Sequence, residues 1–209
     1  MTDPDQADEA PMSTAASLTV IAAEQRRVGR RVTFNPAYMN GAWAIAWFLG
    51  FGAAYLAYGR DRVIPAWLGP TVPIVLLVVA TAATIAYSIR IGSGITGPSR
   101  MSAAMYGWSW MLGFACLDVV NLALARDGMP EKTVTLLWSA SSLLLVGMMH
   151  LAGGALWRDT MLYATGVWTL LASAGAVLVG VPGNFLVLAL AGGGGFAVLA
   201  AYTAWRRRI

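Results

Sequence analysis

The sequence predicts an all-α protein, a polytopic transmembrane bundle of about six helices. Three observations predict this class: 58% of the residues are hydrophobic, 11% are charged, and the hydrophobic residues fall in long runs separated by short polar connections. Soluble domains average ~45–50% apolar and ~25% charged residues. The 14 basic and 10 acidic side chains are too few to cover a water-soluble domain of 209 residues, so we expect lipid to surround most of the chain.

Six apolar runs are long enough to act as membrane spans. At ~1.5 Å per residue, each crosses a ~30 Å hydrocarbon layer or comes close with its flanking residues. Gly and Pro pairs interrupt the connections between the runs, as is usual for loops. These runs make up a predicted transmembrane domain, residues 37–209, and they cover residues 40–58, 70–90, 104–125, 133–153, 160–180 and 184–205.

The N-terminal segment differs in composition from the spans. Residues 1–16 are acidic and poor in bulky apolar groups, so they are predicted to form a disordered cytoplasmic tail. In residues 17–36, apolar side chains recur at helical spacing and basic side chains occupy many of the positions between them. This pattern is typical of a helix lying on anionic lipid headgroups. The basic side chains expected at that membrane surface are Arg26, Arg27, Arg30 and Arg31.

The distribution of Lys and Arg predicts the orientation. Ten of the 14 lie in the N-terminal arm, the connections after the second and fourth spans, and the C-terminus. The opposite side has Arg60, Arg62, Arg126 and Lys132. Positive residues are enriched in cytoplasmic loops, so both termini are expected in the cytoplasm of a bacterial inner membrane protein.

A short pattern recurs in the odd-numbered spans. Trp47-Phe48-Leu49-Gly50-Phe51 in the first span matches Trp110-Met111-Leu112-Gly113-Phe114 in the third, and Trp168-Thr169-Leu170 in the fifth is similar. One interpretation is a two-helix hairpin used three times in the same orientation. The alternative is that Trp, Leu and Gly are simply common in membrane spans.

Asp118 is the only carboxylate predicted inside a span. A charge at the centre of a transmembrane helix costs ~2.5–3.5 kcal/mol on insertion scales, so Asp118 is expected to face protein or water and to have a partner. Asn121 lies almost one turn further on, and Thr135 and Ser139 reach a similar depth from the fourth span. This cluster either binds a proton, cation or polar substrate, or forms a hydrogen-bonded clasp between two helices.

A second candidate site is a histidine in the fourth span. His150 lies near the cytoplasmic end of the fourth span, where it either relays protons or is satisfied by water or a backbone carbonyl.

Four successive glycines, Gly192, Gly193, Gly194 and Gly195, lie in the sixth span, although each costs ~1 kcal/mol of helix propensity relative to Ala. Close helix packing offsets this cost, or the helix breaks to line a cavity. The face of small residues expected to receive these glycines is Ala172, Ala176 and Gly180.

Composition argues against several kinds of chemistry. One Cys and one His exclude a disulfide framework and make a metal centre built from several His or Cys side chains unexpected. No nucleophile and base pair and no paired carboxylates stand out, so no enzymatic activity, metal or other cofactor is predicted. The basic residues cluster at the ends of the apolar runs, which indicates membrane topology rather than nucleic-acid binding.

The Trp-x-Leu-Gly segments, the basic arm before the first span, and the bias toward Arg, Ala and Gly support a family comparison. The chain resembles six-span integral membrane proteins of uncharacterised function from high-GC actinobacteria. Its Trp-x-Leu-Gly segments are also similar to those of the short-repeat acid-resistance membrane family. The resemblance implies a six-span bundle and carries over no functional residue.

Two functions remain open from the sequence. One is a transporter or channel subunit for a small solute, ion or proton, and the other is a non-catalytic scaffold or regulatory partner subunit. Beyond the lipid bilayer, the expected partner is a second copy of the chain or another protein.

Overall fold

The computed structural model describes residues 13, 17–20, 35–92 and 98–206. It divides the chain into two units, residues 1–34 and residues 35–209. In the first unit, residues 17–20 are helical. Apart from Ser13, the predicted acidic tail lies outside the described residues, as do most of the predicted interfacial helix and its four arginines, Arg26, Arg27, Arg30 and Arg31.

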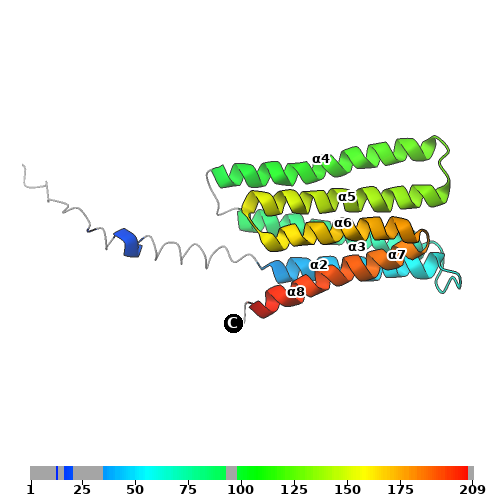
Figure 1. Cartoon of the computed structure of the whole chain (residues 1–209), viewed down its shortest axis with the longest axis horizontal. Helices are drawn as coiled ribbons and strands as arrows, with labels where there is room; N and C mark the ends of the chain where they lie inside the picture. The colour runs from blue at the N-terminus through cyan, green and yellow to red at the C-terminus, as the bar shows by residue number, and fades with distance from the viewer. Residues whose placement is uncertain (1–12, 14–16, 21–34, 93–97, 207–209) are drawn as a thin grey trace, which may run out of the picture. The chain divides into compact units, whose positions relative to one another are not determined.

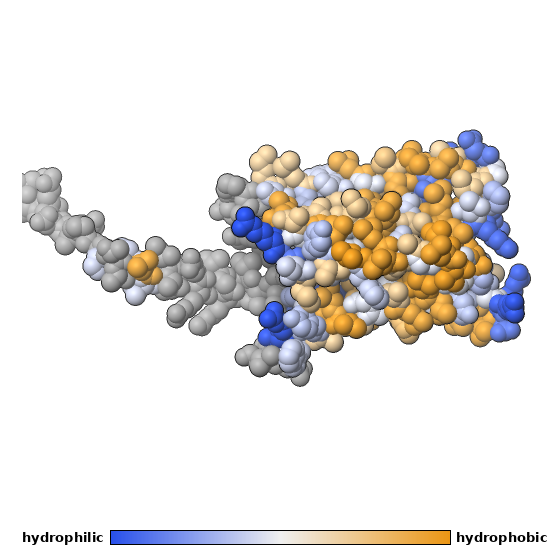
Figure 2. Space-filling view, viewed as in Figure 1, coloured by the Kyte–Doolittle hydropathy of each residue, from blue (hydrophilic) through white to orange (hydrophobic). Residues whose placement is uncertain are grey.

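The second unit is a bundle of long helices (Figure 1). Within the described residues, six helices are long and apolar enough to cross a membrane, which confirms the predicted fold class. Figure 2 shows hydrophobic side chains along the length of the bundle and hydrophilic ones at its two ends. The elements are α2 (Pro36–Tyr58), α3 (Leu68–Gly92), α4 (Pro98–Arg126), α5 (Glu131–Trp157), α6 (Thr160–Val179), α7 (Gly183–Val187), η1 (Leu188–Gly193) and α8 (Gly194–Arg206).

Successive spans run in opposite directions, so the bundle has two distinct ends (Figure 1). We call the end where α2, α4 and α6 begin the Pro36 end, and the end where they finish the Pro130 end. Helix α4 packs on α5, α5 packs on α6, and α6 packs on α7 and η1. The last span consists of α7, η1 and α8 and packs on α2. Helix α2 also packs on α3. Helices α3 and α4 therefore occupy the outer positions of the bundle.

Polar residues at the helix starts explain several boundaries. The Asn35 side chain accepts a hydrogen bond from the Ala37 amide at 3.2 Å, and Pro36 follows it at the first helical position of α2. The Asp159 side chain caps α6 by accepting from the amides of Met161 and Leu162 at 2.9 and 3.1 Å. Such caps satisfy backbone N–H groups that have no partner within the helix.

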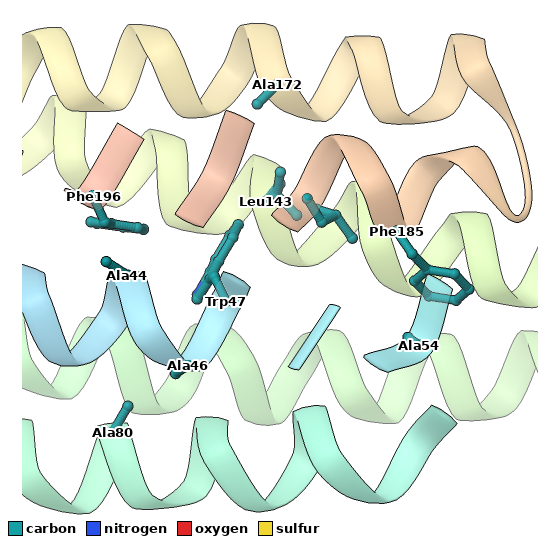
Figure 3. Packing of buried hydrophobic residues seen from close by; sticks show 10 residues of the cluster. Ala44, Ala46, Trp47, Ala54, Ala80, Leu143, Ala172, Phe185 and Phe196 are labelled. Carbon is teal, nitrogen blue, oxygen red and sulfur yellow. The ribbon is translucent and has the colours of Figure 1, made fainter. Parts of the chain in front are cut away.

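The core of the bundle centres on Trp47 of α2 (Figure 3). Its ring meets Phe51 and Phe196 edge-on, with ring centroids 5.4 and 5.6 Å apart. Leu143 of α5 and Leu188 of η1 are buried in the same cluster as Trp47. The buried apolar core thus lies where α2 meets the last span.

The last span is not a continuous α-helix, because η1 is a π-helical segment of six residues. Its glycines allow a close approach to α2. A Cβ on Gly193 would lie 2.8 Å from the backbone nitrogen of Phe48, and one on Gly192 would overlap the ring of Trp47. A Cβ on Gly195 would lie 2.6 Å from the indole nitrogen of Trp168 in α6.

Both of the alternatives that the sequence left open for the glycines therefore hold in part, since the helix is irregular and the glycines also pack closely. The expected receiving face, Ala172, Ala176 and Gly180 of α6, is wrong for Gly192 and Gly193, which contact α2 instead. Gly180 ends α6 with a φ of 74°, in the left-handed region that favours glycine.

Replacing Gly193 by Ala is expected to destabilise the bundle by about 1–3 kcal/mol, because its methyl group would press on the backbone of α2. Gly194→Ala is the matched control. No atom lies within 4 Å of a Cβ at Gly194, whose backbone is helical, so this variant is expected to be neutral or up to ~1 kcal/mol more stable. Unfolding in mixed micelles measures both. Equal stabilities would contradict the packing described.

Candidate functional site

Three of the four buried polar residues described, Asn121, Ser173 and Asn184, donate hydrogen bonds to three successive residues of α5, namely Ser139, Ala140 and Ser141. Each of the three accepts a hydrogen bond from a different neighbouring element. Successive helix residues are ~100° apart, so three adjacent positions can face three neighbours. We call this set of hydrogen bonds the α5 clasp.

The first arm of the clasp joins α4 to α5. Asn121 is 1% exposed, and its side-chain amide donates to the Ser141 hydroxyl oxygen at 2.9 Å. The Ser141 hydroxyl donates in turn to the carbonyl of Leu137, one turn earlier in α5, at 2.6 Å. The serine thus accepts from its neighbour and uses its own proton within its helix.

The second arm repeats this arrangement on the other side of α5. Asn184 of α7 is fully buried, and its side-chain amide donates to the Ser139 hydroxyl oxygen at 3.1 Å. The Ser139 hydroxyl donates to the carbonyl of Thr135 at 2.9 Å. The third arm joins α6 to α5, since the Ser173 hydroxyl donates to the carbonyl of Ala140 at 3.1 Å.

These contacts differ from the predicted cluster of Asp118, Asn121, Thr135 and Ser139. Asn121 faces the protein as expected, but its partner is Ser141. The Thr135 hydroxyl donates to the carbonyl of Glu131 in its own helix. Ser139 contacts the last span rather than α4. The geometry is that of a clasp holding helices together, and its members Ser141, Ser173 and Asn184 were not singled out from the sequence.

Asp118 lies outside the clasp, on the exposed side of α4. Within the described ranges, it forms no hydrogen bond or ion pair with another side chain. Helix α4 turns only one stripe of residues toward α5, and Asp118 is on the flank of that stripe. Asp118 was expected to face protein or water and to have a partner; it is exposed, and the described residues of this chain supply no side-chain partner for it. The stripe comprises Ser102, Tyr106, Trp110, Gly113, Phe114, Leu117, Asn121 and Ala125.

His150 belongs to an aromatic cluster nearer the Pro36 end. Its Nδ1 lies 2.8 Å from the carbonyl oxygen of Val146, which fits the hypothesis of a histidine satisfied by the backbone. Its ring meets Trp110 of α4 edge-on at 5.6 Å and lies 6.2 Å from Phe196 of α8. The imidazole therefore connects three spans and is separated from Asp118 by about two turns of α4.

A small cavity lies beside η1, and its volume of about 10 Å³ is at the lower limit for holding one water molecule. Trp168 of α6 lines it and donates from its indole nitrogen to the carbonyl of Ala191 at 2.8 Å. Trp47 also lines it, and the Trp47 indole nitrogen is one of two buried side-chain atoms without a hydrogen bond among the described residues. The other atom is the Asn184 carbonyl oxygen.

Comparisons of the chain with protein-family models, with curated proteins and with solved structures give no match. Function must therefore be argued from the arrangement of the side chains themselves.

Double-mutant cycles are expected to resolve the arms of the clasp. Asn121→Ala with Ser141→Ala, and Asn184→Ala with Ser139→Ala, should each give a coupling energy of about 0.5–1.5 kcal/mol, the range found for hydrogen bonds between membrane helices. The exchanged pairs, Asn121 with Ser139 and Asn184 with Ser141, are the controls and should give coupling near zero. Equal coupling in all four cycles would contradict the assigned partners. Unfolding in mixed micelles provides the measurement.

Proposed function

We propose that this protein is a non-catalytic subunit of a larger membrane assembly, and that a partner docks on the outer side of α4. The observation that supports this most is the exposed position of Asp118 within an apolar span. A carboxylate on a lipid-facing surface is costly, whereas the same group in an interface between proteins can be paired.

The surroundings of Asp118 support an interface. Only 6% of the most apolar stretch of α4 is buried, compared with 33% for α2 and for the last span. Helix α3 is also peripheral, at 11%, but it has no charged side chain before Arg90, so lipid suits its outer face. Exposed apolar surface alone therefore does not distinguish α4 from α3. The feature that distinguishes α4 is the exposed carboxylate of Asp118.

The interior of the bundle also favours a structural role. The buried Asn121 and the amide group of Asn184 are engaged in the α5 clasp, which holds four elements in one arrangement. Such a clasp makes a rigid body that can present a fixed surface to a partner. We place this subunit in the plasma membrane, with both termini in the cytoplasm, on the strength of the Arg distribution.

A transporter or channel subunit for a small solute, ion or proton is the second candidate. It is favoured by the π-helical segment η1, because such irregular turns are frequent at functional sites. The unpaired Trp47 indole nitrogen adds a buried polar group beside this segment, and the adjacent cavity has an apolar lining.

Photo-crosslinking is expected to detect the partner on α4. Leu122 is 46% exposed one turn after Asp118, so a benzophenone amino acid at this position should form a protein adduct of defined mass in native membranes. The adduct should weaken with Asp118→Asn. Leu178 of α6 is 86% exposed and serves as the matched position, where we expect lipid adducts. Lipid adducts alone at both positions would refute the subunit proposal.

A flux assay separates the two candidates. Wild-type protein and the Asp118→Asn and Trp47→Phe variants are reconstituted in vesicles that contain a pH-sensitive dye. The subunit proposal predicts proton leak equal to that of protein-free vesicles for all three. Wild-type leak above this level that falls in either variant would favour proton transport instead.

A further inference from the structure

We infer that the helix covering Asp118 belongs to a different membrane protein, and that it carries a Lys or Arg side chain at the depth of Asp118. The inference rests on the proposed function, and it specifies the chemistry of the partner. Three properties of the chain lead to it: the depth of the carboxylate, the positions of the chain's own cations, and the form of the exposed surface around Asp118.

Depth decides whether the carboxylate needs a partner. Helix α4 has 29 residues, and Asp118 lies about 9 Å from its midpoint at ~1.5 Å per residue. A ~30 Å hydrocarbon layer centred on that midpoint extends about 6 Å beyond Asp118. The short side chain of Asp does not span this distance, so lipid headgroups and water are out of its reach.

The positions of the cations argue against a second copy of the chain as the occupant. In the described residues, every Lys and Arg of the bundle lies in a connection or near a helix end, such as Arg90, Arg126 and Lys132. His150 is closer to the Pro36 end and is enclosed by aromatic rings. A second copy would therefore bring another carboxylate to this depth and no cation. Charge complementarity requires a different chain.

Side chains are exposed on every side of α4 except the stripe that faces α5. One set of these exposed residues, which we call the Asp118 seam, follows the alternating three- and four-residue spacing of a helix that packs against another helix. Ala115 is small and exposed one turn before Asp118, which permits close approach of a partner backbone. The Asp118 seam consists of Trp108, Met111, Ala115, Asp118 and Leu122.

The two carboxylate oxygens of Asp118 offer several acceptor positions and no donor in the charged form. A Lys ammonium or Arg guanidinium supplies both the countercharge and the donors, and paired opposite charges are the usual arrangement inside membranes. A partner span with such a residue about one-fifth of the way from its end at the Pro130 side would meet Asp118 in register.

The test uses designed transmembrane peptides and the full-length chain in phosphatidylcholine vesicles. One Leu/Ala peptide carries a single Lys about one-fifth of the way along its span, at the depth of Asp118, and a matched peptide has Leu there. Energy transfer between labelled chain and peptide measures binding. Wild-type protein should bind the Lys peptide about tenfold more tightly than the Leu peptide, and Asp118→Asn should abolish the preference.

A charge exchange guards against misfolded variants. Asp118→Lys should prefer a peptide with Asp in place of the Lys, a gain that a misfolded protein cannot produce. Two results would overturn the inference: equal binding of both peptides to the wild type, or transfer between two labelled copies of the chain that disappears with Asp118→Asn. If one of these results is found while crosslinking at Leu122 still gives a protein adduct, the inference about the Lys or Arg partner fails and the proposed function stands. If Leu122 gives lipid adducts alone, the proposed function fails as well.

Discussion

The structure depends on one constraint, which is that polar groups inside a hydrocarbon layer must find partners within the protein. Long helices satisfy the backbone, and hydroxyl side chains follow the same rule. Ser139 and Ser141 each donate to a carbonyl one turn earlier, which leaves their oxygen atoms able to accept from Asn184 and Asn121. The result is a pair of equivalent links on two sides of α5. Apolar surface alone would not determine which helices pack together, because lipid chains are as apolar as leucine side chains.

Close packing provides the second source of specificity. Where α2 meets the last span, the absence of side chains at Gly192 and Gly193 lets the Trp47 ring and the backbone at Phe48 approach η1. The π-helical turn shifts the register of the last span at this contact. The core therefore joins the first and last spans of the described bundle, while α3 and α4 remain at its margins. This arrangement leaves α4 the most exposed of the six spans.

At the outer surface of the bundle, Asp118 departs from the constraint that polar groups find partners within the protein. It lies three residues from Asn121, yet one side chain is exposed and the other is buried. The polar groups of the interior hold the helices together, and the charged group faces outward. The separation of these two tasks is the main reason to regard the protein as a part of a larger assembly. The His150 cluster contacts the opposite, α5-facing side of α4 through Trp110, and the cavity at η1 is lined by α2, α5, α6 and the last span, so neither forms part of that surface.

The sequence alone determined the fold class and the approximate limits of the spans, because the length and apolarity of each run are sufficient to require a transmembrane helix. It also identified Asn121 and Asp118 as polar side chains within a span whose surroundings needed explanation. It did not reveal Asn184, whose polar character was visible but whose position at the start of the last span gave no indication of depth. The recurring Trp-x-Leu-Gly pattern did not indicate that Trp47 is buried while Trp168 is half exposed.

Only the tertiary structure decided which side of each helix faces inward. Asn121 and Asp118 are separated by ~60° around α4, and Ser139 and Ser141 by ~160° around α5. In a soluble protein, the apolar stripe of a helix reveals its buried face, but in lipid both faces are apolar and this signal is lost. The rotation of α4 and α5 is set by Asn121, Ser141 and the packing of Gly113 against Leu145. These contacts depend on helices that meet only in the assembled bundle.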